Sequence, residues 1–254
     1  MGGDFYSPRH RHNFEQVRFQ IEGTLDYGRN GKLTKGMVGY FPEGMHYGPQ
    51  SQDPEDTPMT AVLQCGGASG SGYLSRNESK AGMEELSRFG EFKDGVFRRN
   101  EDAEGKRNMD GYQAIWEHKH GRAMVCPEPR YNSPIFMDPA HYEWLPVEGA
   151  PGVTEKLLGI FSECHTEAGF LKLDAGAAYR AGGRGLYFVV SGTGTIDGQP
   201  LRRFTTLFVG RGETASIEAT GTAEILHLGL PDLASIGIGD GKGEGKVAAA
   251  AAAE

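Results

Sequence analysis

Glycine-rich turns divide this chain into short stretches of strand-forming residues, and this punctuation limits the fold more than any other feature of the sequence. The chain has 39 glycines among its 254 residues, while its aromatic content of 10% is ordinary. Many short strands joined by tight turns suit this composition better than a helical bundle does. We therefore expect a fold dominated by β-structure.

The strand-like runs fall into two groups. The first group lies at 17–21, 37–41 and 60–64, with a hairpin turn at 28–31. The second group lies at 157–161, 169–173, 185–190, 205–209 and 223–228, with glycines between the runs. Each run is short, rich in β-branched or aromatic residues and bounded by turn residues, which is typical of strands. The chain is thus expected to contain two β units.

The region between the two groups has a different character. Charged patterns with helical spacing occur at 78–89 and 110–118, and a proline-rich stretch follows them. We predict an N-terminal β unit at 1–75, a helical and extended connector at 76–150, a C-terminal β unit at 151–238 and a low-complexity tail at 239–254. Since only nine residues precede His10, the first unit is expected to be truncated at its N-terminus.

Charge and cysteine content exclude some functional classes. The formal net charge of −8 disfavours a nucleic-acid partner, and we find neither a membrane-spanning apolar run nor a leader peptide. Cys65, Cys126 and Cys164 are odd in number and form no CxxC pair, so buried thiols in a reducing compartment are expected. We predict a cytoplasmic protein without nucleic-acid or membrane partners.

The chemically informative residues are three histidines near the N-terminus. His10 and His12 lie two positions apart, so in a strand they point to the same face, and Gln16 has the same parity. A strand and a Pro-Glu-Gly turn then lead to His46. Three neutral imidazoles on a rigid wall suit a borderline divalent metal ion. The alternative is a pair of surface histidines.

The other histidines give weaker signals. His118 and His120 follow a predicted helix, where positions two apart diverge, so we expect helix-end residues without shared ligation. His165 and His227 lie in strand-like runs without histidine partners and are expected to be packed or surface side chains.

These residues give the chain its resemblance to the cupin superfamily. His10, His12, Gln16 and Gly23 follow the spacing of the first cupin motif, with Gln16 in place of the usual glutamate. Gly36, Pro42, Gly44 and His46 follow the second motif, with one residue fewer than usual before the histidine. The resemblance implies two cupin barrels, which are double-stranded β-helices of the jelly-roll type.

The second β unit resembles a cupin barrel without metal ligands. Aligned on its glycines, it places Tyr179, Ala181, Gly185 and Ala215 where the family's ligands stand. The resemblance therefore implies one metal site, with His10, His12, Gln16 and His46 as ligands in the N-terminal barrel. Fe(II) is the leading choice, with Mn, Ni, Cu and Zn as alternatives.

Further residues are expected around that site. Arg18 follows Gln16 at strand spacing and is predicted to anchor a substrate anion, with a rim salt bridge as the alternative. Gln16 and Arg18 are the predicted catalytic residues. Tyr40, Phe41 and Gln64 are predicted to line the substrate pocket.

If all protein ligands are neutral, they do not compensate the positive charge of the metal, and a bound anion would do so. Together with the resemblance, this predicts a cupin oxygenase of the dioxygenase type, acting on a small anionic organic substrate that chelates the metal. The alternatives are a metal-dependent isomerase, lyase or hydrolase of a sugar-like or acidic substrate, and a cupin that binds a small ligand without catalysis. A homodimer is expected, because exposed strand edges need covering.

Overall fold

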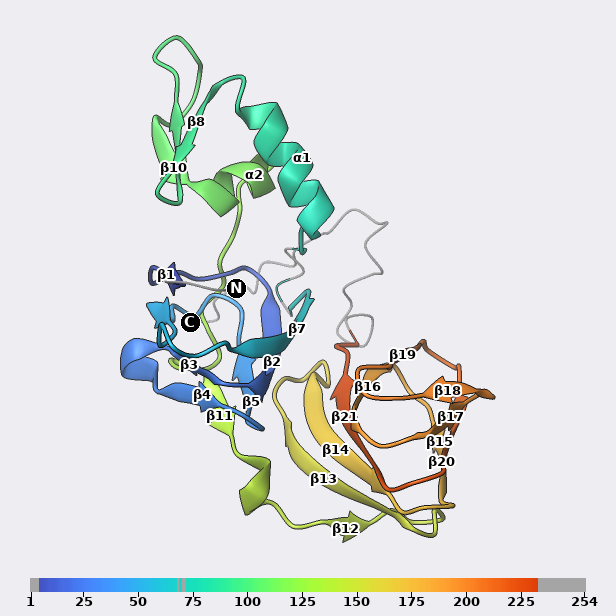
Figure 1. Ribbon diagram of the computed structural model, residues 1–254. Helices are drawn as coiled ribbons and strands as arrows, with labels where there is room; N and C mark the ends of the chain where they lie inside the picture. The colour runs from blue at the N-terminus through green and yellow to red at the C-terminus, as the bar shows by residue number, and fades with distance from the viewer. Residues whose placement is uncertain (1–4, 68, 70–71, 233–254) are drawn as a thin grey trace, which may run out of the picture.

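A computed structural model describes residues 5–67, 69 and 72–232 of the chain (Figure 1). Strands make up 42% of the structure and helices 12%, which confirms the predicted β-dominated class. The tail predicted at 239–254 lies outside the described residues. No helix in the described part of the chain is both long and apolar enough to span a membrane.

The N-terminal β unit contains two four-stranded sheets. One has the order β11-β5-β2-β7, formed by Ile135–Met137, Val38–Phe41, Glu15–Glu22 and Met59–Cys65. The other has the order β1-β6-β3-β4, formed by Tyr6–Ser7, Gln50–Ser51, Thr24–Asp26 and Lys32–Thr34. A 3₁₀ helix, η1 (Gly28–Asn30), forms the predicted turn between β3 and β4. The central strand β2 is buried on both faces over most of its length.

A helical insertion at residues 75–121 stands off the sheets at the top of Figure 1. Its helices are α1 (Arg76–Leu86), which begins with a Ser75–Glu78 capping box, and α2 (Gly111–His120), which is capped by Asp110 and ends at Gly121 in a left-handed conformation. A sheet of β8 (Gly90–Lys93), β9 (Val96–Arg99) and β10 (Asn108–Asp110) completes it. The two predicted helices are confirmed, whereas the small sheet was not predicted.

The C-terminal β unit also has two sheets. The larger has the order β12-β13-β14-β21-β16-β19, formed by Leu145–Pro146, Val153–Ile160, Glu167–Leu173, Ala223–Gly229, Gly185–Ser191 and Thr206–Val209. The smaller has the order β15-β20-β17-β18, formed by Ala178–Ala181, Ala215–Ala219, Gly194–Ile196 and Gln199–Leu201. Side chains from both sheets form one apolar core, which includes Ala181 and Ala215 at two of the positions predicted to lack ligands.

The predicted connector contributes strands to both units. β11 pairs with β5 of the first unit, and β12 pairs with β13 of the second, with the 3₁₀ helix η2 (Pro139–His141) between them. The sheets of both units therefore include part of the predicted connector, because β11 and β12 are edge strands of these sheets.

The two units pack against each other through one face of β2. Val17 and Phe19 belong to an apolar cluster that also contains Phe170 and Leu226 of the second unit, and the Phe19 and Phe170 rings lie 5.8 Å apart. Tyr40 stacks on Phe161 at 4.3 Å between ring centroids. Burial of this cluster joins the units.

A buried carboxyl group lies at this interface. Glu15 is only 3% exposed, and its oxygens accept hydrogen bonds from Tyr40 Oη at 2.9 Å and from Thr166 Oγ1 at 2.6 Å. Burial raises the pKa of Glu15, while the hydrogen bonds from Thr166 and Tyr40 oppose this shift. Thr166 is thus a buried polar link from the second unit to the central strand of the first.

The link predicts a stability difference between two matched variants. Thr166→Val should lower the free energy of unfolding by about 1.5–3 kcal/mol, because it deprives a buried carboxyl group of a donor. Thr154→Val makes the same change at a hydroxyl that is buried without a hydrogen-bond partner among the described residues, and should be neutral or stabilising. Urea unfolding measures both. An equal decrease in the free energy of unfolding of the two variants would contradict the role of Thr166.

Candidate functional site

Two imidazoles and one phenol meet in the N-terminal β unit. The Nε2 atoms of His10 and His12 lie 3.1 and 3.0 Å from Tyr47 Oη. The backbones of His10 and Tyr47 form an antiparallel bridge, with N–H···O distances of 3.1 and 3.0 Å. Residues directly opposite each other in such a pair place their side chains on the same face, so the bridge brings Tyr47 to the histidine pair.

His46 lies outside this cluster, unlike in the predicted ligand set. Met45 and Tyr47 are each 1% exposed, whereas the His46 side chain is exposed and its carbonyl oxygen accepts a hydrogen bond from Arg9 Nη2 at 3.3 Å. Residues alternate between faces along an extended segment, so the inward positions fall to 45 and 47. No group of three or more His, Cys, Asp or Glu side chains among the described residues is placed to hold a metal ion.

Arg18 is buried beside the cluster and uses all of its N–H groups. Nε donates to Gln16 Oε1 at 3.0 Å, Nη1 donates to Gln50 Oε1 at 2.6 Å and Tyr27 Oη at 2.8 Å, and Nη2 donates to Gln16 Oε1 at 2.7 Å and Tyr47 Oη at 3.0 Å. These contacts equal the number of donors that a guanidinium carries. Arg18 therefore has no donor left for a substrate anion in this arrangement, contrary to prediction.

The buried charge of Arg18 has no acidic partner. None of the ion pairs in the described part of the chain involves it, and its partners are neutral oxygens. The ring of Phe41, a predicted pocket residue, lies 4.7 Å from the guanidinium carbon and contributes a cation–π contact. The surroundings of the histidine pair consequently carry positive charge.

Gln16 is a partner of Arg18. Its Oε1 atom accepts hydrogen bonds from Arg18 Nε and Nη2 and from Tyr47 Oη, the last at 3.3 Å. Gln16 thus holds Arg18 in place, and its predicted role as a ligand stays a prediction.

Burial keeps the three central groups uncharged. It lowers the pKa of His12 to about 3, with the charges of His10 and Arg18 acting in the same direction, and it also lowers the pKa of His10. It raises the pKa of Tyr47 to about 12, while the Arg18 charge opposes that shift. At neutral pH the site therefore contains two neutral imidazoles and a protonated phenol.

The hydrogen bonds of His10 define its tautomer, but those of His12 leave one nitrogen without a partner. His10 Nδ1 lies 2.7 Å from the carbonyl oxygen of Pro8 and donates to it, so His10 Nε2 is an acceptor in the neutral ring. His12 Nδ1 is buried and has no hydrogen-bond partner among the described residues. A buried nitrogen without a partner costs free energy, and a functional role is one reason for a protein to retain it.

Aromatic side chains also pack against His12. Phe14 stacks on the imidazole at 4.4 Å, and the Tyr112 ring meets it edge-on at 5.8 Å. Tyr112 belongs to α2 of the helical insertion and donates from its hydroxyl to Asn13 Oδ1 at 3.2 Å. The insertion thus supplies part of the wall of the site.

The remaining predicted pocket residues lie elsewhere. Tyr40 faces the interface between the units, where it binds Glu15, and Gln64 accepts a hydrogen bond from Tyr73 Oη at 3.0 Å. Tyr27, Tyr47, Gln50 and Tyr112 are the site residues that the sequence analysis missed. The sequence does contain a signal for Tyr47. The second motif is one residue shorter than usual if it ends at His46, and it has its usual length if it ends at position 47.

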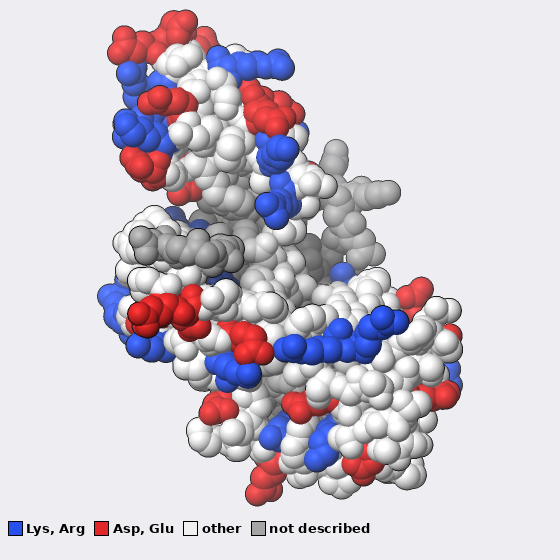
Figure 2. All heavy atoms as spheres, in the orientation of Figure 1, with Lys and Arg blue, Asp and Glu red and all other residues white. Residues whose placement is uncertain are grey.

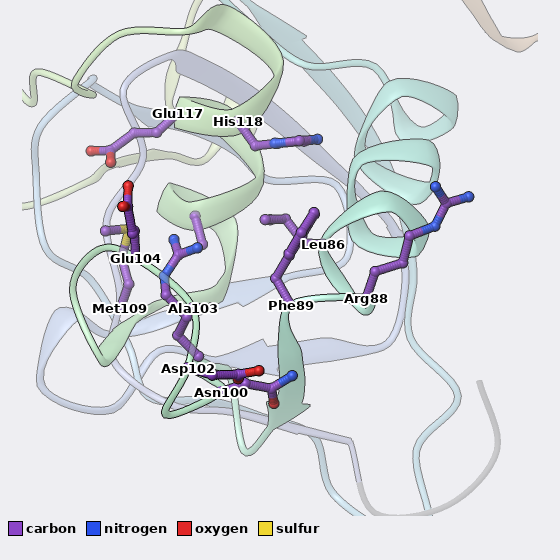
Figure 3. A pocket seen from close by; sticks show the side chains of 12 residues that line it. Leu86, Arg88, Phe89, Asn100, Asp102, Ala103, Glu104, Met109, Glu117 and His118 are labelled. Atoms are coloured by element: carbon purple, nitrogen blue, oxygen red, sulfur yellow. The ribbon is translucent and has the colours of Figure 1, made fainter.

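A hollow of about 750 Å³ lies within the helical insertion (Figure 3). Leu86, Phe89 and Met109 give it apolar walls, and acidic and basic side chains, among them Arg88, Asp102 and Glu104, surround them. It contains none of the residues of the histidine cluster.

His118 lies at that hollow and pairs with Glu85 at 2.7 Å, while His120 stacks on Trp116 at 4.1 Å. These two histidines have separate partners near the end of α2, as expected.

The low pKa of His12 predicts a pH dependence of stability in metal-free protein. Between pH 6.5 and about 3 the unfolded chain binds a proton on His12 that the folded chain does not, so the free energy of unfolding should fall as the pH falls. We expect His12→Gln to reduce this slope by up to about 1.4 kcal/mol per pH unit. Urea unfolding between pH 4.5 and 6.5 with a chelator measures it. Identical slopes would show that His12 is not buried as a neutral ring.

Comparisons with known proteins add information on the fold. No protein-family model matches the chain, and no curated protein matches it. Solved structures are similar to it over most of its length. A Nostoc punctiforme protein assigned as a dioxygenase has a TM-score of 0.59 and 11% identity, over 92% of this chain and 68% of that one.

Two further structures agree. The salicylate 1,2-dioxygenase of Pseudoaminobacter salicylatoxidans, in a single-residue mutant form, has a TM-score of 0.51 and 14% identity, over 94% of this chain and 70% of that one. The oxalate decarboxylase of Bacillus subtilis has a TM-score of 0.52 and 13% identity, over 91% and 66%. These neighbours are cupin proteins, and at such low identity the similarity shows that the chain shares their fold.

Proposed function

We propose that this chain is a metal-dependent enzyme of the dioxygenase type, acting on a small anionic organic substrate, and that His10, His12 and Tyr47 hold its metal ion. The observation that carries the proposal is the meeting of two neutral imidazole nitrogens at one phenol oxygen, at 3.1 and 3.0 Å. Two nitrogens and one oxygen from three residues form a donor set similar to two histidines and a carboxylate, which suits non-haem Fe(II).

The surroundings of these donors fit a metal ion. His10 donates from Nδ1 to a backbone carbonyl, which is the usual arrangement of a histidine that ligates through Nε2. Tyr47 Oη accepts a hydrogen bond from Arg18, so negative charge on this oxygen is stabilised. Tyr47 thereby takes the place expected for His46. Iron(II) is the leading choice for the metal, with Mn, Ni, Cu and Zn as alternatives.

The side chains of the chain itself explain the preference for an anion. The buried charge of Arg18 has no acidic partner among the described residues, so the site attracts negative charge without direct contact from the guanidinium. Phe14 and Tyr112 keep water away from His12. When bound, the metal would supply Lewis-acid and oxygen chemistry beside the substrate.

A metal-dependent lyase is the second candidate. It is favoured by the similarity in fold to an oxalate decarboxylase, whose name describes a decarboxylation and not an oxygenation. Oxygen uptake separates the two reactions. The sequence-based expectation of a homodimer stays a prediction.

The metal assignment predicts which substitutions release the ion. His12→Ala should lower the metal content of protein reconstituted with Fe(II) at least about tenfold, and Tyr47→Phe should weaken binding because it removes an oxygen donor while keeping the ring. His46→Ala is the matched control and should keep full content, since that side chain is exposed. Elemental analysis after dialysis measures all three.

Two outcomes would contradict the assignment. Loss of metal in His46→Ala with retention in Tyr47→Phe would restore the three-histidine set. Absence of metal from the reconstituted wild-type protein would exclude a metal enzyme. With metal bound, oxygen-electrode measurements with catechol-type, β-dicarbonyl and hydroxy-acid substrates should show uptake for the oxygenase and none for the lyase.

A further inference from the structure

The helical insertion is built as a separate packing unit. Its apolar core consists of Leu74, Leu86, Phe97, Ala114, Ile115 and Trp116, all from the insertion or the residue beside it. Figure 1 shows it away from both β units, and Figure 2 shows acidic and basic side chains interspersed over its outer surface. Such a surface is typical of a solvated exterior, so the functional contacts of the insertion are expected at its inner end.

That inner end touches the histidine cluster through Tyr112. The Tyr112 ring lies 5.8 Å from both the His12 and the Phe14 rings. Its hydroxyl donates to Asn13, which is fully buried and whose amide in turn donates to the Gly72 carbonyl at 3.4 Å. One side chain of the insertion thus combines an aromatic contact and a hydrogen bond to the segment that carries His12.

One nitrogen of the His12 imidazole lacks a hydrogen-bond partner among the described residues. His12 Nε2 is bonded to Tyr47, whereas His12 Nδ1 is buried and unpaired among the described residues. A buried unpaired nitrogen favours a ligand that can form a hydrogen bond to it. The Phe14 ring stacks on the His12 imidazole at 4.4 Å and the Tyr112 ring lies edge-on to it at 5.8 Å, so both rings pack against the imidazole that carries this nitrogen.

We propose that Tyr112 controls access to the histidine site, so that a ligand reaches His12 by displacing the Tyr112 ring. The ligand that fits is a small polar anion with a hydrogen-bonding group for His12 Nδ1. The size and the hydroxyl of residue 112 then determine which anions enter. This inference rests on the proposed function in one respect only, because it takes the histidine pair as the ligand site.

Carbethoxylation of His12 by diethyl pyrocarbonate tests access in metal-free protein, with mass spectrometry to identify the modified residue. Tyr112→Ala should raise the rate at His12 about tenfold, because it opens the wall and releases Asn13. Tyr112→Phe keeps the ring and loses only the hydrogen bonds of the hydroxyl, to Asn13 and to the Leu74 backbone, so its rate should rise by less than about threefold.

Phe89→Ala is the control, because it removes an exposed ring of the insertion that belongs neither to its core cluster nor to the ring contacts of His12. Its rate at His12 should stay close to that of the wild type, and thermal unfolding confirms that each variant is folded. Equal rates in wild type and Tyr112→Ala would overturn the proposal, as would an equal rise in Phe89→Ala. If the rates separate as expected but no metal binds, the role of Tyr112 stands and the metal assignment fails.

Discussion

The buried guanidinium of Arg18 is the interaction on which the site depends. Its hydrogen bonds join β2 to Tyr27 after β3, to Gln50 at the start of β6 and to Tyr47 in the loop between β5 and β6. A charge buried without an acid is costly unless every donor is satisfied, and here neutral oxygens satisfy each one. The same hydrogen bonds hold the Tyr47 hydroxyl between the two imidazoles. Arg18 therefore contributes both to the packing of the N-terminal unit and to the geometry of the site.

Side chains along β2 alternate between a face that points to the site and a face that packs against the C-terminal unit. Gln16 and Arg18 face the site, while Glu15, Val17 and Phe19 face the C-terminal unit. The second unit therefore contributes to the site indirectly, because its packing holds the strand that carries Arg18. Its own interior is an apolar core, which suits a supporting role.

The helical insertion adds an aromatic side chain to a site that is otherwise built by the N-terminal β unit. The imidazole of His12 contacts Tyr47, which is bonded to Arg18, and it also contacts Phe14 and the insertion's Tyr112. Polar, positively charged and aromatic groups therefore meet around one imidazole.

The sequence by itself determined the β-rich class, the two helices of the insertion and the pairing of His10 with His12. These follow from local rules: the turn residues, the helical spacing with its caps, and the parity of an extended segment. The tertiary structure decided the third member of the site. Whether position 46 or 47 points inward depends on the register of the bridge between His10 and Tyr47, and a shift of one residue exchanges the two faces. It also decided the roles of Arg18 and Gln16, because their partners Tyr27, Tyr47 and Gln50 come from other segments of the chain, which only the folded sheets bring within hydrogen-bonding distance.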